Sequence, residues 1–185
     1  VLCLMDIFSE ECFKYEINYV PLCKQNWKAQ ISEGTFDLFL AESAWRGNNG
    51  DWSYCLSNYG GKFGRIFSAV LAEIKRSGMP TVFWNKEDPV HFERFRKTAS
   101  LCDHVFTTDC RRIIPYLSTS RSLTQTVSSC PFYASPKIHN LLPSTRKWQP
   151  TSAYGGTYYG ERYPERTEYM DIIMNAAAPL GLTIY

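Results

Sequence analysis

The sequence predicts an α/β fold, with a Rossmann-like, largely parallel sheet and helices on both faces. Short apolar or β-branched runs alternate along the chain with segments of helical period. Strands that alternate with helices indicate βαβ units with right-handed crossovers. Most of the predicted strands also end on polar residues, and in open parallel sheets ligands bind outside the carboxyl ends of the strands.

The elements of the first 140 residues follow from these patterns. Strands are expected over residues 1–5, 17–22, 37–41, 81–84 and 104–107, and helices over 26–33, 65–77 and 111–117. A further helix is expected after Pro89, which suits the first turn of a helix. Residues 118–129 are rich in Ser and Thr and leave their strand content open.

A second pattern begins near Pro150. Residues 153–157 and 182–185 are expected to be strands and 164–178 a helix. We therefore expect a domain over residues 1–140, a linker over 141–150 that contains Pro143 and Pro150, and the start of a second Rossmann-like unit over 151–185. The first residues, VLCLMD, have neither an initiator Met nor a basic segment, so we expect no signal peptide and an excised piece of a longer protein.

Composition excludes several classes of protein. Twenty basic and 18 acidic residues give a net charge of +2, which argues against bulk nucleic-acid binding. No apolar run approaches the ~20 residues of a membrane span. Seven scattered cysteines without a CxxC pair indicate reduced thiols in a cytoplasmic protein. The three dispersed histidines and the absence of HExxH predict no metal site.

Polar residues at the strand ends are the first candidates for a binding site. Asp6, Glu42, the 85–88 segment and Asp109 follow four of the predicted strands. Together they would build a cleft of hydrogen-bond acceptors for a hydroxyl-rich ligand. The alternative is that they are routine helix N-caps, where Asp and Ser are favoured.

The densest cluster is the segment WNKEDPVHF at 84–92. Glu87, Asp88 or His91 could accept a proton from an attacking hydroxyl group, with Asn85 and Lys86 as substrate contacts. Lys86 could instead neutralise Glu87, and His91 could be a capping or packing residue. Trp84 and Phe92 would form apolar walls on either side of the cluster.

Two further segments are weaker candidates. Trp45 could stack on a sugar and Arg46 could bind phosphate or carboxylate, in a long flexible loop that runs to Gly61 and is either functional or disordered. Gly156 and Tyr158 with Arg162 and Arg166 form a strand, turn and helix start that could bind an anion, or a plain turn with surface arginines.

Several of these motifs together resemble one family. FLAESAWRG (39–47), PTVFWNKEDPVHF (80–92), DHVFTTD (103–109), PFYASPKIHN (131–140) and GGTYYGERYPER (155–166) resemble the spore-maturation-protein-like (CgeB-like) glycosyltransferases. These bacterial proteins are related to group 1 glycosyltransferases of the two-Rossmann GT-B type. The resemblance covers nearly the whole chain in order.

The resemblance implies the N-terminal half of a GT-B architecture, with metal-independent transfer from a nucleotide-diphosphate sugar to a glycan or metabolite acceptor. That sugar nucleotide is a co-substrate, and no cofactor is implied. Glu87, Asp88 and His91 would line the acceptor side, and Lys137 and His139 would lie near the domain junction. Gly156, Tyr158, Arg162 and Arg166 would approach the donor diphosphate.

One departure limits this expectation. Such enzymes usually carry a downstream Glu-x7-Glu motif that contacts the donor, and the sequence reaches Tyr185 without it. The remaining C-terminal domain would then be the partner of this piece, which we expect to be inactive alone. One alternative is a non-catalytic glycan- or protein-binding module that uses Trp45, Trp52 and Trp84. A nucleotide-binding oxidoreductase is a less favoured alternative, because the GxGxxG motif is missing.

Overall fold

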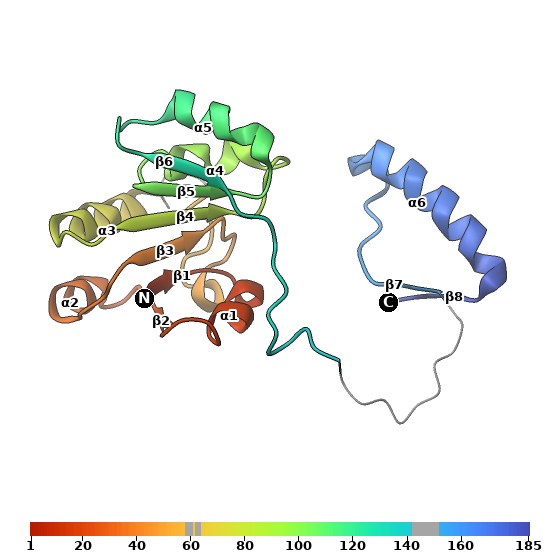
Figure 1. The fold of residues 1–185 in the computed structure, drawn as a ribbon, viewed down its shortest axis with the longest axis horizontal. Helices are drawn as coiled ribbons and strands as arrows, with labels where there is room; N and C mark the ends of the chain where they lie inside the picture. The colour runs from red at the N-terminus through yellow and green to blue at the C-terminus, as the bar shows by residue number, and fades with distance from the viewer. Residues whose placement is uncertain (58–60, 62–63, 142–151) are drawn as a thin grey trace. The chain divides into compact units, whose positions relative to one another are not determined.

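The chain forms two compact units, Val1–Asn140 and Leu141–Tyr185. The structure is a computed structural model, shown in Figure 1, and it describes residues 1–57, 61, 64–141 and 152–185. The linker predicted at 141–150 lies outside the described residues apart from Leu141, as does Gly60 of the predicted long loop. Each unit is described by itself below.

Within the described residues, the first unit contains a six-stranded sheet in which all neighbouring strands are parallel. Its strands are β1 (Leu2–Leu4), β2 (Val20–Pro21), β3 (Phe39–Glu42), β4 (Thr81–Asn85), β5 (His104–Thr107) and β6 (Thr126–Ser129). The order is β2-β1-β3-β4-β5-β6, so the direction of winding reverses between β1 and β3. The predicted α/β fold with a Rossmann-like parallel sheet is confirmed.

Helices cover both faces of this sheet (Figure 1). They are α1 (Ile7–Phe13), α2 (Trp27–Glu33), α3 (Gly64–Arg76), α4 (Phe92–Ala99) and α5 (Ile113–Thr119), with short 3-10 turns η1 (Asn48–Gly50) and η2 (Cys110–Arg112).

The two faces are covered unequally. Phe67 of α3 lies against Phe39, and Phe95 of α4 lies against Phe83. The register pairs Phe39 with Thr81 and Ala41 with Phe83, so these two aromatic contacts lie on the same face. On the opposite face, α1 places the ring of Phe13 against Trp84. The larger part of the hydrophobic core therefore lies between the sheet and the helices that come after β2 in the chain.

One local expectation was wrong, one helix was not predicted, and one stretch that had been left open ends in a strand. Helix α1 was not predicted, because its buried residues are Ser9 and Cys12 while its apolar Ile7 and Phe8 are exposed. Pro89 does not lie in the first turn of α4, which begins at Phe92. The Ser- and Thr-rich stretch whose strand content was left open ends in β6, because its backbone pairs with β5.

The second unit is a small βαβ element. Strands β7 (Ser152–Tyr154) and β8 (Leu182–Ile184) are parallel neighbours. Helix α6 (Pro164–Ala177) joins them, with the 3-10 turns η3 (Gly160–Arg162) before it and η4 (Ala178–Leu180) after it. The predicted strand, helix and strand are all present. Among the described helices of both units, none has the length and apolar character needed to cross a membrane.

Candidate functional site

The carboxyl ends of the parallel strands bring the polar residues of the sequence prediction to one edge of the sheet. Asp6 lies two residues after β1, Glu42 ends β3, and Asn85 ends β4 beside Thr107 of β5. The reversal of winding between β1 and β3 is the topological switch point, where ligands of open α/β sheets bind. The strongest site candidate is therefore the space next to Asp6 and the loop after β3.

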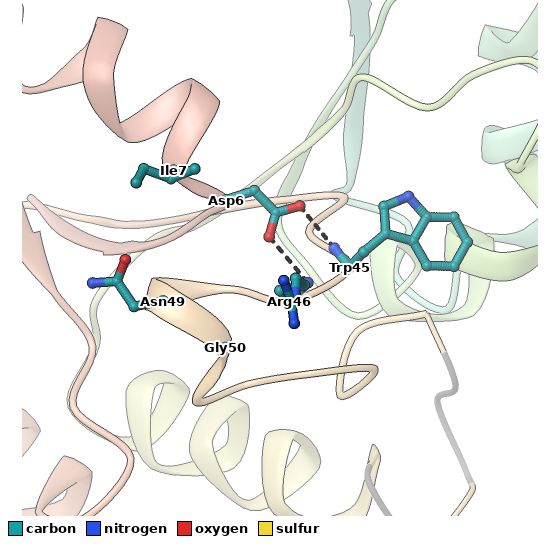
Figure 2. A pocket seen from close by; sticks show the side chains of 6 residues that line it. All are labelled: Asp6, Ile7, Trp45, Arg46, Asn49 and Gly50. Carbon is teal, nitrogen blue, oxygen red and sulfur yellow. Dashed lines mark hydrogen bonds between the residues drawn. The ribbon is translucent and has the colours of Figure 1, made fainter. Parts of the chain in front are cut away.

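Asp6 fixes the loop after β3. Its carboxylate accepts backbone N–H bonds from Trp45 (2.9 Å), Arg46 (3.0 Å) and Gly47 (2.7 Å), and Figure 2 shows this carboxylate directed at the loop. Hydrogen bonds from N–H donors to an ionised carboxylate are charge-assisted and therefore strong, and Asp6 accepts three of them. The predicted substrate ligand Asp6 is thus already engaged within the protein, and its main effect is to position Trp45 and Arg46.

The described part of the loop, residues 45–57, is packed at Gly47 and Asn48, contrary to the expectation of a flexible segment there. Gly47 has φ +57°, and an added Cβ would lie 2.8 Å from Leu4 Cδ2, so glycine avoids both backbone strain and crowding there. Asn48 is buried and bonds to the backbone of Met5, Cys3 and Leu22.

Of the three tryptophans considered for sugar recognition, two expose little or no surface at the edge beside Asp6. Trp52 is fully buried and donates its indole N–H to Leu22 O. Trp84 is 5% exposed. Trp45 is half-buried and is the one of these three that presents surface at the edge.

A pocket of about 390 Å³ opens beside Asp6, at the switch point. It is lined by Asp6, Ile7, Trp45, Arg46, Asn49 and Gly50, as drawn in Figure 2. The volume is within the range of about 300–1,000 Å³ of small-molecule sites. Arg46 is exposed and takes part in no ion pair among the described residues. It can therefore offer its guanidinium to a ligand.

His91 lies next to Trp45, and Glu87 lies next to His91. The imidazole of His91 lies edge-on to the indole of Trp45, with 5.0 Å between ring centroids. His91 Nε2 is 3.9 Å from Glu87 Oε2, and the two side chains are 25% and 26% exposed. The structure therefore brings together Trp45, Glu87 and His91, three of the residues predicted for substrate binding and catalysis.

Asp88 turns away from this group into a polar network beneath α4 and α5. Its carboxylate accepts hydrogen bonds from Asn85 Nδ2 (2.9 Å), Thr107 Oγ1 (2.6 Å) and the Tyr116 hydroxyl (3.0 Å). Burial raises the pKa of the Asp88 carboxyl above its usual value, against the opposing effect of the Thr107 and Tyr116 hydroxyls. Asn85 is fully buried in the same network, so both residues hold the turn after β4 in place. The predicted apolar wall Phe92 is also buried here, against the ring of Tyr116.

Glu42 and Lys86 form a second network on the α1 side of the sheet. Lys86 Nζ lies 3.0 Å from Glu42 Oε1, and their side chains are 9% and 1% exposed. Glu42 also accepts from the Ser9 hydroxyl and the Asp6 amide. Burial raises the pKa of the Glu42 carboxyl, and Lys86 and Ser9 oppose that effect. Lys86 thus pairs with Glu42 and not with Glu87 or an external phosphate, and buried Glu42 has no surface for a ligand.

The remaining predicted residues of the first unit lie apart from the Asp6 pocket. Asp109 caps η2, and its side chain bonds to the backbone and guanidinium of Arg111, which lowers the pKa of the Asp109 carboxyl. Lys137 is exposed. His139 borders a different cleft beside α1, together with Trp84. Sequence patterns did not reveal this cleft, because its other walls come from the unpredicted α1 and from residues 132–133.

In the second unit, two arginines stack on tyrosines. Arg162 lies over the rings of Tyr159 and Tyr163 at 5.8 and 5.5 Å, and Arg166 lies over Tyr159 at 5.4 Å. The Tyr158 hydroxyl donates to Asp171 (3.1 Å), and Gly156 is exposed beside Tyr154. Both guanidinium groups are exposed, so the turn presents two cations supported by aromatic rings.

No group of three or more His, Cys, Asp and Glu side chains suited to a metal ion occurs among the described residues. All seven cysteines are free thiols. Compared with protein-family models, with curated proteins and with solved structures, the chain matches none. The residues and their geometry therefore carry the functional proposal.

Proposed function

We propose that the chain is part of a glycosyltransferase that moves a sugar from a nucleotide-diphosphate donor to a hydroxyl acceptor, as its CgeB-like motifs suggest. The first unit would hold the acceptor. The observation that supports this most directly is the position of Trp45, which lines the 390 Å³ pocket and also contacts His91. The proposed sugar-binding pocket and the proposed proton acceptor, His91, therefore both adjoin Trp45.

The pocket suits a small polyhydroxylated ligand. Trp45 borders the pocket, and in this proposal its ring would give sugar C–H groups an apolar contact, while Arg46 and the amide of Asn49 would supply hydrogen-bond donors. Asp6 holds the backbone of residues 45–47 with three hydrogen bonds. A pre-positioned wall of this kind reduces the ordering that binding requires.

His91 and Glu87 supply the acid–base chemistry in this proposal. The acceptor hydroxyl oxygen attacks the anomeric carbon of the donor and forms the new C–O bond. His91 takes the hydroxyl proton, and the neighbouring Glu87 carboxylate stabilises the imidazolium. The bond from the anomeric carbon to phosphate breaks, and the nucleoside diphosphate leaves with the electron pair. Contacts as long as 3.9 Å commonly shorten in the substrate complex.

The second unit would contribute the donor side. Arg162 and Arg166 are exposed and stacked on tyrosine rings, which fixes their planar guanidinium groups for phosphate oxygens. They would stabilise the charge on the departing diphosphate without a metal ion.

A second candidate is a non-catalytic sugar-binding module. This candidate is favoured because three carboxylates already have partners within the protein. Asp6 accepts bonds from the loop after β3, Asp88 accepts them from Tyr116 and its neighbours, and Glu42 pairs with Lys86. None of the three is poised to take a proton. In this candidate Trp45 would recognise the sugar, and Glu87 and His91 would have no chemical role.

The test is a thermal-shift screen of the full-length protein against a panel of nucleotide sugars, followed by measurement of nucleoside-diphosphate release with candidate acceptors. A ligand that binds only the native state raises the melting temperature. His91→Ala is expected to abolish transfer and retain binding, and Arg162→Ala to weaken binding of the nucleotide sugar. Asp88→Asn is expected to lower transfer by loosening the turn.

His104→Ala is the matched control, because His104 starts β5 at the opposite edge of the sheet. Full transfer in both His91→Ala and Asp88→Asn, with normal melting, would contradict the proposed site. Sugar binding that depends on Trp45 without any transfer would favour the binding module.

A further inference from the structure

A second cleft, separate from the Asp6 pocket, lies between α1 and the segment that follows β6. Its volume is about 210 Å³. Ile7 borders the Asp6 pocket, whereas the next residues, Phe8 and Ser9, border this cleft. The start of α1 therefore separates the two spaces. In Figure 1 the chain after β6 descends beside α1.

Aromatic rings form most of the wall. Trp84 has edge-on contacts with Phe13 (5.8 Å between centroids) and Phe132 (5.6 Å), and Phe13 has another with Tyr133 (5.6 Å). Phe8 borders the mouth. The indole N–H of Trp84 donates to Cys130 O at 2.9 Å, which fixes the central ring. Rings that already contact one another edge to face need little rearrangement to receive another ring.

The mouth of the cleft is open. Phe132 and Tyr133 are 57% and 40% exposed although they belong to this aromatic group. Large apolar side chains that gather around a concavity and stay exposed mark a binding site more often than single exposed ones do. The volume lies below that of sites for drug-sized molecules, so the ligand has one or two rings.

The polar groups that line the cleft indicate the charge and the polar atoms of the ligand. The residues that line it include Ser9, Cys12 and His139, and none of the described lining residues is acidic or basic apart from that histidine. The Ser135 amide donates to His139 Nδ1 at 2.9 Å. Because Nδ1 accepts this bond, the donor of the ring is its Nε2–H group.

We propose that this cleft binds a neutral, planar aromatic molecule of one or two rings that carries an oxygen acceptor, which the His139 Nε2–H group bonds. The assignment does not depend on glycosyl transfer, because it rests on the rings of α1, β4 and residues 132–133 and on the fixed tautomer of His139. It gives the molecule a ligand site that the Asp6 pocket does not account for.

The test uses naphthol, a planar two-ring molecule with a hydroxyl oxygen, and compares it with naphthalene, decalinol and decanol. Affinities are measured by titration calorimetry, and the site is located from chemical-shift changes of backbone amides. Naphthol is expected to bind most tightly, with changes at residues 8–13 and 130–139. Phe132→Ala is expected to weaken naphthol about tenfold, and His139→Ala two- to tenfold.

His139→Ala should leave naphthalene affinity unchanged, because naphthalene has no oxygen to accept the bond. Leu123→Ala is the matched control: Leu123 is fully exposed in the same unit and outside the cleft. Phe132 and His139 are both exposed, so neither variant should unfold the chain, and melting curves check this.

Three results would each overturn the proposal: decalinol or decanol binding as tightly as naphthol, shift changes that map away from the cleft, or unchanged naphthol affinity in Phe132→Ala. Full sugar transfer in His91→Ala would count against the proposed function alone, so the two proposals can fail separately.

Discussion

The removal of the Asp6 carboxylate should loosen the loop that carries Trp45. In Asp6→Ala the backbone amides of Trp45, Arg46 and Gly47 all lose their acceptor. A hydrogen bond to a charged group contributes about 1.5–3 kcal/mol. The carboxylate is 19% exposed, so water can replace part of these bonds, and we expect a loss of about 2–4 kcal/mol in the free energy of unfolding.

Asp6→Asn gives a sharper comparison. Oδ1 accepts from both Arg46 and Gly47, while Oδ2 accepts only from Trp45. An asparagine can keep the first two bonds and must place its NH2 group against the Trp45 amide. We therefore expect a loss of about 1–2 kcal/mol, smaller than that of the alanine variant.

Urea unfolding followed by fluorescence measures both variants. For a unit of this size, 1 kcal/mol corresponds to a melting shift of roughly 3 °C. Asp37→Asn is the control, since Asp37 is an exposed carboxylate of the same unit and its loss should change little. If Asp6→Ala costs less than about 0.5 kcal/mol, or Asp6→Asn costs as much as the alanine variant, the assignment of Asp6 as the anchor of the loop is refuted.

Two further predictions concern charges elsewhere in the first unit. Lys86→Met leaves Glu42 buried without its cation and should lower the free energy of unfolding by about 3–5 kcal/mol. The double variant with Glu42→Gln should be more stable than Lys86→Met alone. If urea unfolding finds that the losses of the two substitutions add, the pairing of Lys86 with Glu42 is refuted. Although burial would raise the pKa of the Asp103 carboxyl, bonds from the Thr81 hydroxyl and amide and the charge of Lys75 lower it below its usual value of 3.8. A lowered pKa in the folded state gives stability that is present above the unfolded value and lost as the pH falls through the folded one. The difference in stability between wild type and Asp103→Asn should therefore be constant near neutral pH and shrink below about pH 4, and a difference that grows in acid would contradict this.

The regular elements could be predicted because their patterns are local. Helix α3 buries Phe67, Val70, Leu71 and Ile74, which recur at helical spacing, and β5 occupies the residues expected for it. Helix α1 inverts the usual pattern, with buried Ser9 and Cys12 and exposed Ile7 and Phe8. A hydrophobic period cannot detect such a helix, although Asp6 at its N-cap position and Glu10 in its first turn were signals of its start.

The contents of the site depend on contacts that span many residues. Asn48 holds its loop to Cys3 and Met5 by bonds across more than 40 positions, and no local pattern indicates them. For the same reason the sequence placed Lys86, Glu87 and Asp88 together without showing that they point in three directions. Only the fold decides that Lys86 meets Glu42, Asp88 meets Tyr116 and Glu87 meets His91.

These three directions explain how the turn after β4 keeps its shape. Lys86 ties the turn to the α1 side of the sheet through Glu42, and Asp88 ties it to the other side through Thr107 and Tyr116. Between them, the amides of Lys86 and Glu87 donate to the buried Ser43 hydroxyl. A segment held from both faces has few alternative conformations, and buried, satisfied networks specify a single one. The carboxylates that serve this purpose are engaged within the protein, which leaves Glu87 and His91, beside Trp45, as the pair at this edge that is both positioned and partly exposed.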